Sequence, residues 1–369
     1  MSLDYFKINQ QNTKVLNVKI QNDVTTYLNF SLPLCAILWN ENKVSWLYEH
    51  FTQVYCINKK KEFFWLDYME NLYFPKDTAE YFFMDSNSME SVTDIISFLK
   101  NMINECHYVI LFVDSFYLPG KTQYLNTHAH IQVLFYGYDE MKKSFLSIGF
   151  DKQSIFTFFE DSYDDVSKAY FEGKNFYMKA PEWVRLYTAV LLKMEEPDKE
   201  YIFNPENFIE SFKNYTLSTG ESTMLRPEIR ASRSENAVYG LKVNDELLFH
   251  LNNLLVGGYS MDYRFIHLLA EHKALLYRKL HYISNFVNRD NLREKTAEYK
   301  EIAEKFELVR RQYLKNVLID NNFETFYGPL KNKVVIQKII DAVSTLYKKE
   351  SILLEEILGQ LIKNKRIIK

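Results

Sequence analysis

The sequence predicts an α+β protein, and three observations support this prediction. Short β-branched and aromatic runs bounded by turn residues occur in the first half, and Ile131 to Tyr136 is the clearest of them. From Pro181 onward, longer segments with apolar residues at helical spacing dominate. The length of 369 residues fits two domains. We therefore expect a sheet-containing domain over residues 1–175 and a mainly helical domain over residues 176–369.

Composition excludes several classes of protein. A net charge of -3 argues against a nucleic-acid-binding protein, because such domains usually carry a strong basic excess. Three cysteines are too few for a disulfide framework, so we expect a reducing, cytoplasmic environment. No stretch approaches the ~20 apolar residues of a membrane span, and no signal peptide is visible at the start of the sequence.

In the first 113 residues the pattern predicts two strands and three helices around an irregular segment, and one of these helices is the short apolar helix that carries Cys35. Val15 to Ile20 partly alternates apolar and polar residues, as a half-buried strand does. Val44 to Tyr55 and Ser91 to Ile103 have the apolar spacing of amphipathic helices. Residues 62–85 read as irregular and aromatic-rich, and Tyr108 to Val113 is a fully apolar strand.

A hairpin follows, with strands expected over Ile131 to Tyr136 and Phe145 to Phe150. After it we expect a loop up to Ser162, which would cap a helix through Tyr170. Glu182 to Met194 could form another strand. Further helices are expected over Asn207–Tyr215, Asn236–Leu255, Asp262–Val287, Arg289–Asn316 and Lys331–Leu361, with an exposed loop at Thr219–Glu235 that carries Arg226, Arg230 and Arg233.

The first candidate for chemistry is Cys35. Ser31 and Pro33 are residues that favour a helix start, so Cys35 would lie in the first turn or two of an apolar helix. There the free backbone N–H groups favour the thiolate. Cys35 is also compatible with a buried structural role, and Cys106 beside His107 is the fallback nucleophile.

A cysteine on a helix, then a histidine on a strand and an aspartate on the next strand, is the chain order of papain-like enzymes. Cys35 would be the nucleophile, His130 the base and Asp151 the residue that orients the imidazole, because the two ends of a hairpin lie side by side. Asn29, six residues before Cys35, would donate to the oxyanion.

Three alternatives stay open at this point. His128 shares a strand face with His130 and could be the base instead. Asp139 could orient the histidine, or it could simply be the carboxylate of the hairpin turn. His128 and His130 could also bind a metal ion together with Asp114 or Asp139, although a His-x-His pair alone is a weak signal.

Several blocks of the sequence resemble the butirosin-biosynthesis acyltransferase family. In the first half these are Val-Asp114-x-Phe-Tyr-Leu-Pro and the His-rich strand that ends in Tyr-Gly137-Tyr-Asp139. In the second half they are Tyr239-Gly-Leu-Lys-Val-x-Asp245-x-Leu and Met261-Asp-Tyr-Arg264-Phe-Ile-His267-Leu-Leu-Ala-Glu271-His272-Lys273. The resemblance covers most of the chain.

The resemblance implies a papain-like fold and acyl transfer in nonribosomal-peptide-type biosynthesis. Cys35 would accept an acyl group from the phosphopantetheine thioester of an acyl or peptidyl carrier protein. An amine deprotonated by His130, with Asp151 as orienter, would then take it. No metal or other cofactor of the protein is implied. A cysteine peptidase or amidase of the same fold and a non-catalytic binding protein are the alternatives, and the acyl group, the amine and the oligomeric state stay undefined.

Overall fold

The computed structural model describes residues 12–59, 63–70, 78–177, 182–195, 200–220, 237–257, 261–287, 289–322 and 329–364. It is a mixed α+β structure with antiparallel sheets. The chain forms two compact units, one from Met1–Glu41 and Tyr73–Lys199, the other from Asn42–Leu72 and Glu200–Lys369. The expected loop with Arg226, Arg230 and Arg233 lies outside the described residues.

This division of the chain differs from the expected boundary at residue 175. Strand β9 (Ala189–Met194) pairs with both β4 (Ala79–Met84) and β5 (His107–Asp114), so the chain up to residue 199 stays with the first unit. Strand β2 (Val54–Lys59) pairs with β10 (Ala237–Tyr239), which joins the segment 42–72 to the helical unit. Strand pairing between distant segments therefore sets the division.

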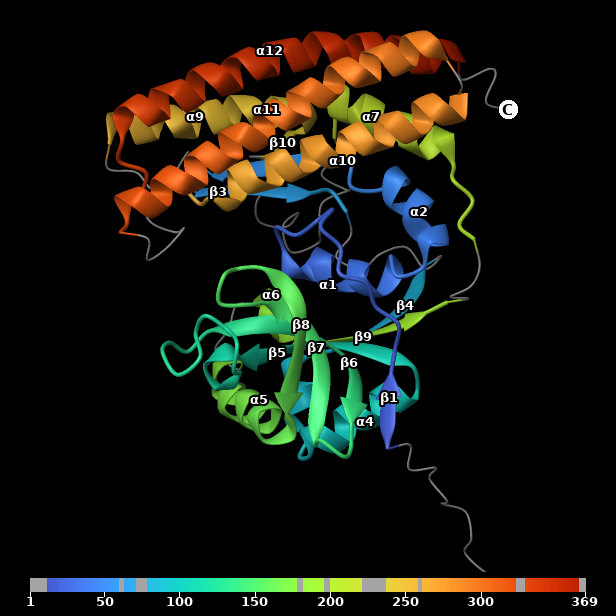
Figure 1. Cartoon of the computed structure of the whole chain (residues 1–369), viewed down its shortest axis with the longest axis vertical. Coiled ribbons are helices and arrows are strands. Elements are labelled where there is room, and N and C mark those ends of the chain that lie inside the picture. Colours follow the sequence, from blue (N-terminus) through green and yellow to red (C-terminus); the bar gives the residue numbers. More distant parts are fainter. Residues whose placement is uncertain are drawn as a thin grey trace, which may run out of the picture. The chain divides into compact units, whose positions relative to one another are not determined.

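The first unit is built on one antiparallel sheet with the strand order β4-β9-β5-β6-β7-β8, and β1 also pairs with β6 (Figure 1). Its remaining strands are β1 (Thr13–Val15), β6 (His130–Asp139), β7 (Ser144–Phe150) and β8 (Phe156–Ser162). A bulge in β6 lies between Phe135 and Gly137. Gly137 is needed there because a Cβ atom would lie 2.9 Å from the backbone oxygen of Lys14 on β1.

Helices cover both faces of this sheet. Helix α1 (Leu28–Ile37) packs against β6, β7 and β9, whereas α4 (Ile95–Asn104) and α5 (Tyr163–Tyr177) pack against β5. Figure 1 shows α1 on one side of the sheet and α4 and α5 on the other. Strand β5 is buried along its whole length, as its apolar run from Tyr108 to Val113 predicts. The short helices α3 (Ser86–Glu90), α6 (Glu182–Leu186) and η2 (Ser115–Tyr117) complete the described part of the unit.

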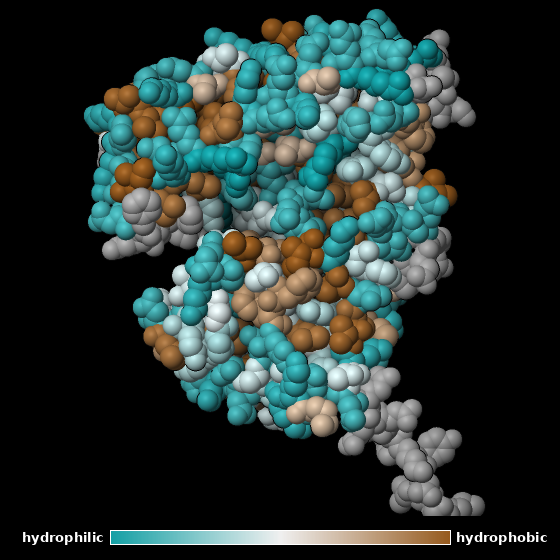
Figure 2. Space-filling view, viewed as in Figure 1, coloured by the Kyte–Doolittle hydropathy of each residue, from teal (hydrophilic) through white to brown (hydrophobic). Residues whose placement is uncertain are grey.

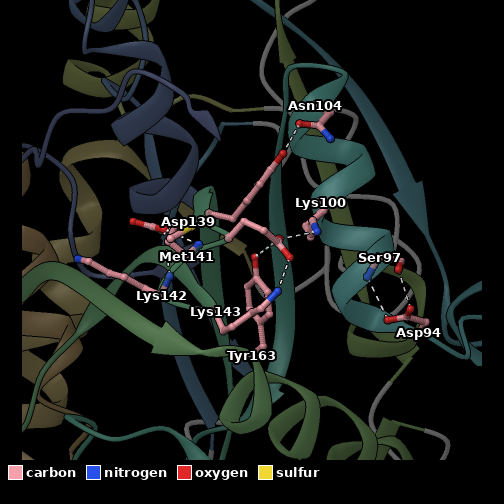
Figure 3. Close-up of polar contacts among 11 residues, drawn as sticks. Asp94, Ser97, Lys100, Asn104, Asp139, Met141, Lys142, Lys143 and Tyr163 are labelled. Atoms are coloured by element: carbon pink, nitrogen blue, oxygen red, sulfur yellow. Dashed lines mark hydrogen bonds and ion pairs between the residues drawn. The ribbon is translucent and has the colours of Figure 1, made fainter. Parts of the chain in front are cut away.

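A polar cluster around Glu140 joins three elements of the first unit (Figure 3). Its carboxylate accepts from Lys100 on α4 at 2.6 Å, from Lys143 at 2.5 Å and from Tyr163 on α5 at 3.1 Å. The hydrogen bonds from Lys100 and Lys143 lower the pKa of Glu140 to about 2. Asp94 caps α4 by accepting the backbone N–H of Ser97 at 3.0 Å.

The second unit is mainly helical. Its helices are α2 (Val44–Glu49), α7 (Pro205–Thr216), α9 (Val243–Val256), α10 (Arg264–Val287), α11 (Asp290–Asp320) and α12 (Lys333–Asn364), with η5 (Gly240–Lys242) and the end of η1 (Glu41–Lys43). A small antiparallel sheet of order β10-β2-β3 accompanies them, with β3 at Phe63–Tyr68. The face of the long helices in Figure 2 is mostly hydrophilic with scattered apolar side chains, as expected for amphipathic helices around a core.

The core of the second unit encloses an ion pair. Lys273 on α10 lies 2.8 Å from Glu350 on α12, and both side chains are 0% exposed. Tyr299 on α11 donates to Glu350 at 2.7 Å, and Lys273 hydrogen bonds to the hydroxyl of Tyr215 on α7. Burial lowers the pKa of Lys273, and the neighbouring Glu350 opposes this shift. The pair therefore ties four helices together in the interior.

Several predicted elements are confirmed, among them the hairpin strands, α4, β5, α7, α10 and α11. Other expectations were wrong. Strand β1 ends at Val15, so Leu16–Ile20 is not a strand, and Glu182–Leu186 is helix α6, with only Ala189–Met194 forming a strand. The helix expected from Asn236 begins at Val243, after β10 and η5. Residues 62–85 contain strands β3 and β4, and the segment after Asp151 contains β8. The helix expected over Val44–Tyr55 ends at Glu49, and Val54 already begins β2. Strands β4 and β2 pair with the distant strands β9 and β10, whereas β3 and β8 pair with the strands just before them, β2 and β7. In each case strand pairing overrides the local pattern.

A further error concerns helix α1. It begins at Leu28 and contains Pro33 in its interior, so Ser31 and Pro33 do not mark its start. Cys35 is the eighth of its ten residues.

Candidate active site

A short hydrogen bond joins His128 to Asp114 at the end of strand β5. Nδ1 of His128 lies 2.6 Å from Oδ2 of Asp114. The other carboxylate oxygen accepts the backbone N–H groups of Phe116 at 3.1 Å and Ala129 at 3.2 Å. The Asp114 side chain is 3% exposed, whereas the His128 side chain is 59% exposed. A carboxylate held by the backbone thus accepts a hydrogen bond from Nδ1–H of His128, which leaves Nε2 as the basic nitrogen.

Two contacts fix the orientation of the imidazole. Besides the bond to Asp114, the His128 ring stacks on Phe116 with 4.2 Å between centroids and 18° between planes. The ring of Tyr117 lies 6.0 Å away. The imidazole and the carboxylate that orients it are therefore held in one arrangement, which general acid–base chemistry would require.

The strand register explains why the pair forms. Asp114 is opposite His130 in the antiparallel ladder between β5 and β6. The loop after Asp114 closes on itself, because both the N–H and the hydroxyl of Ser115 donate to the backbone oxygen of Ala129 at 2.8 Å. This closure brings His128, just before β6, back to the end of β5.

Cys35 lies in the core of the same unit and is 0% exposed. Burial raises the pKa of its thiol to about 12, although a hydrogen bond with the backbone of Gln21 opposes the shift. Because Cys35 stands near the carboxyl end of α1, the helix-start effect expected from the sequence is absent, and this prediction was wrong. The thiol stays neutral until a base removes its proton.

Helix α1, which contains Cys35, covers the sheet face on which the side chain of Asp114 lies. Side chains alternate along β5, so Asp114 shares a face with Tyr108. Tyr108 donates to the backbone oxygen of Asn17 at 2.7 Å, and two residues later Lys19 donates its N–H to the backbone oxygen of Cys35. The segment that leads to α1 therefore crosses this face at the Tyr108 end of β5, six residues along the strand from Asp114, and α1 packs on β6 and β7.

His130, the predicted base, is the first residue of β6. Burial lowers the pKa of its imidazole, while Asp114 opposes the shift and His128 adds to it. The carboxylate opposite it in the ladder is Asp114. Asp114 makes its short bond to His128, so the structure pairs the alternative histidine with a carboxylate that the sequence analysis considered only as a metal ligand.

Asp151, the predicted orienter, caps its own turn. Its Oδ1 accepts the backbone N–H groups of Gln153 at 2.9 Å and Ile155 at 2.8 Å, in the connection from β7 to β8. Asp139 does the same for the hairpin turn by accepting from Met141 at 2.9 Å and Lys142 at 3.1 Å, as Figure 3 shows. The structure brings neither carboxylate into a hydrogen bond with a histidine among the described residues.

Asn29, the predicted oxyanion donor, is the second residue of α1. Its Nδ2 atom is buried and makes no hydrogen bond to the described residues. Six residues of one continuous α-helix separate Asn29 from Cys35, a rise of about 9 Å. An oxyanion donor must lie about 3 Å from the reacting oxygen, so this spacing does not suit a role shared with Cys35.

The sequence also suggested a metal site and a fallback nucleophile. No group of three His, Cys, Asp or Glu side chains among them is arranged to hold a metal ion. Cys106, the fallback nucleophile, is an exposed free thiol just before β5. Within the described part of the chain, no helix is both long and apolar enough to cross a membrane.

Sequence reasoning missed the role of Asp114 as the carboxylate that orients a histidine, although it considered Asp114 as a metal ligand. A usable signal was present. Asp114 ends a fully apolar strand, and the histidines begin the strand that pairs with it. Comparison with known proteins adds no assignment, because no protein-family model and no curated protein matches the chain.

Proposed function

We propose that this protein is a papain-like, cysteine-dependent N-acyltransferase that forms an amide in secondary-metabolite biosynthesis. Its acyl donor would be the phosphopantetheine thioester of a carrier protein, and its acceptor a small amine, in the cytoplasm. The observation that carries the proposal is the His128–Asp114 pair on the sheet face covered by the helix of Cys35. In this proposal His128 and Asp114 take the roles first assigned to His130 and Asp151.

The two half-reactions use one base. His128 removes the proton from the Cys35 thiol as sulfur attacks the thioester carbonyl, and it returns the proton to the departing pantetheine thiol. The acyl group is then a thioester of Cys35. In the second step His128 takes a proton from the amine, nitrogen attacks the acyl carbon, and Cys35 leaves as the thiol. Thioester exchange is nearly neutral in free energy and amide formation is favourable, so no nucleotide is consumed.

The enclosed, neutral thiol makes the histidine necessary in this scheme. A thiol with a pKa of about 12 has almost no thiolate at pH 7, so an unassisted attack would be slow. Asp114 supports the imidazolium that forms when His128 accepts the proton. Cys106, which is exposed and lies in the turn between α4 and β5, provides a natural internal control.

The test is the intact mass of the protein after incubation with an acyl thioester of N-acetylcysteamine. We expect one acyl adduct in the wild type and in Cys106→Ala, and none in Cys35→Ala. A diamine should discharge the adduct faster than water does. Release of free acid at the same rate with and without amine would instead indicate a hydrolase. Full amide formation by Cys35→Ala would overturn the covalent mechanism, and the absence of adduct, amide and hydrolysis would refute an enzymatic role.

A further inference from the structure

Lys121 lies in the loop between Asp114 and His128 and is almost completely enclosed. It is 1% exposed, and its Nζ atom makes no hydrogen bond to the described residues. An ammonium group has three donors, and burial without hydrogen bonds opposes folding. A lysine in this position therefore calls for a compensating interaction.

The ammonium group of Lys121 lies against an aromatic ring and a glycine. Nζ lies 3.2 Å from the centroid of the Phe159 ring on β8, a close cation–π contact. On β7, a Cβ atom added to Gly149 would lie only 2.8 Å from Nζ. Gly149 has no positive φ, so its backbone does not require glycine. What the glycine provides is room for the ammonium.

Nearby carboxylates favour the charged form of Lys121. Burial lowers its pKa to about 8, and Asp161 and Asp151 oppose this shift. Asp161 is 2% exposed and accepts the hydroxyl of Ser147 at 2.5 Å. Next to Lys121, Thr122 donates to the backbone oxygen of Asp151 at 3.3 Å. The middle of the loop is thus attached to both strands of the β7–β8 pair.

We propose that Lys121 is a positioning residue, which holds the loop so that His128 stays bonded to Asp114. The ends of this loop carry Asp114 and His128, and its middle is held where Nζ meets Phe159 and Gly149. Loss of this attachment frees the loop to shift, and the imidazole then loses its single orientation. The inference rests on the proposed function for its effect on rate, but its structural consequence is measured without turnover.

The experiment compares three variants of the full-length protein. Lys121→Met keeps a long unbranched side chain and removes the charge. Gly149→Ala fills the space that Nζ occupies. Lys152→Met is the matched control, because Lys152 is exposed and its Nζ lies 5.8 Å from the Tyr124 ring. The readouts are the ¹⁵N spectrum of the His128 imidazole, assigned with His128→Gln, and the kcat and KM of acyl transfer.

We expect the wild type and Lys152→Met to show one tautomer of His128, protonated at Nδ1. Lys121→Met and Gly149→Ala should show a tautomer mixture and about a tenfold lower kcat with KM unchanged. Adding Gly149→Ala to Lys121→Met should cause no further loss, because the atom it would meet is gone. An unchanged His128 spectrum in both single variants would overturn the inference. If Lys121→Met and Gly149→Ala change the His128 tautomer but the wild type transfers no acyl group, the proposed function is refuted and the positioning role of Lys121 stands.

Discussion

Replacing Asp114 with asparagine tests the histidine–aspartate pair most directly. The amide keeps an oxygen that can accept from the N–H groups of Phe116 and Ala129. Its NH₂ group replaces the oxygen that lies 2.6 Å from Nδ1 of His128, and that group donates instead of accepting. His128 must then accept at Nδ1 and carry its proton on Nε2, so the basic nitrogen is lost.

The size of the effect follows from this geometry. A histidine held in the wrong tautomer lowers kcat by on the order of 10⁴ in a serine protease whose orienting aspartate becomes asparagine, and we expect a loss of about 10³ to 10⁴ here. One charge-assisted hydrogen bond is lost and two are weakened. Because His128 is 59% exposed, we expect the free energy of unfolding to fall by only about 1–2 kcal/mol.

The assay measures the rate of amide formation and the thermal unfolding of Asp114→Asn beside two matched variants. Asp151→Asn and Asp139→Asn each change a carboxylate that caps a turn. Both should fold with small losses of stability and retain transfer within about threefold of wild type. Asp114→Asn should fold as well but lose transfer.

Two results would refute this reasoning. If Asp114→Asn kept more than half of the wild-type rate, the pair with His128 would have no catalytic role. If Asp151→Asn lost activity as Asp114→Asn does, the carboxylate expected from the chain order would be the orienter after all.

Three further predictions concern stability and thiol reactivity. The pKa of Glu140, about 2, lies below the value of about 4.3 in an unfolded chain. The ionised Glu140 therefore contributes to the free energy of unfolding above pH 4, and this contribution is lost as pH falls toward 2. Between pH 4 and pH 2 the free energy of unfolding, measured by urea titration, should therefore fall less for Glu140→Gln than for the wild type. The difference should be about 1 kcal/mol, because the Lys100–Glu140 ion pair is partly exposed. Lys273→Met leaves Glu350 buried without its cation and should cost about 3–5 kcal/mol in the free energy of unfolding, measured by denaturant titration. Brief treatment with iodoacetamide at pH 7.5 should label the exposed Cys106 faster than the enclosed Cys35, and peptide mapping should show that denaturation increases the labelling of Cys35.

Controls accompany these predictions. Lys273→Met combined with Glu350→Leu should regain much of the lost stability, since both charges are then absent from the core. A double variant as unstable as Lys273→Met alone would show that packing, and not an unpaired charge, causes the loss. Alkylation of Cys35 in the native protein as fast as Cys106 would contradict the enclosed position of its thiol.

Local sequence patterns determined much of the secondary structure. The hairpin of β6 and β7, the apolar strand β5 and the long helices α10 and α11 follow from runs of β-branched residues or from helical spacing. The resulting α+β class is confirmed. Such patterns are local, because the burial of a strand or of one helix face leaves a period in the sequence itself. The turn role of Asp139 also follows from chemistry within four residues.

Tertiary structure alone decided which groups meet. The bond between Asp114 and His128 depends on the register of β5 with β6 and on the closure of the loop between them. The division into units depends on strands β9 and β10, whose partners are far away in the sequence. Cys35 owes its burial and high pKa to the packing of α1 on the sheet. Residue types thus predicted a kind of chemistry, whereas long-range pairing, which leaves no local period, decided which residues meet.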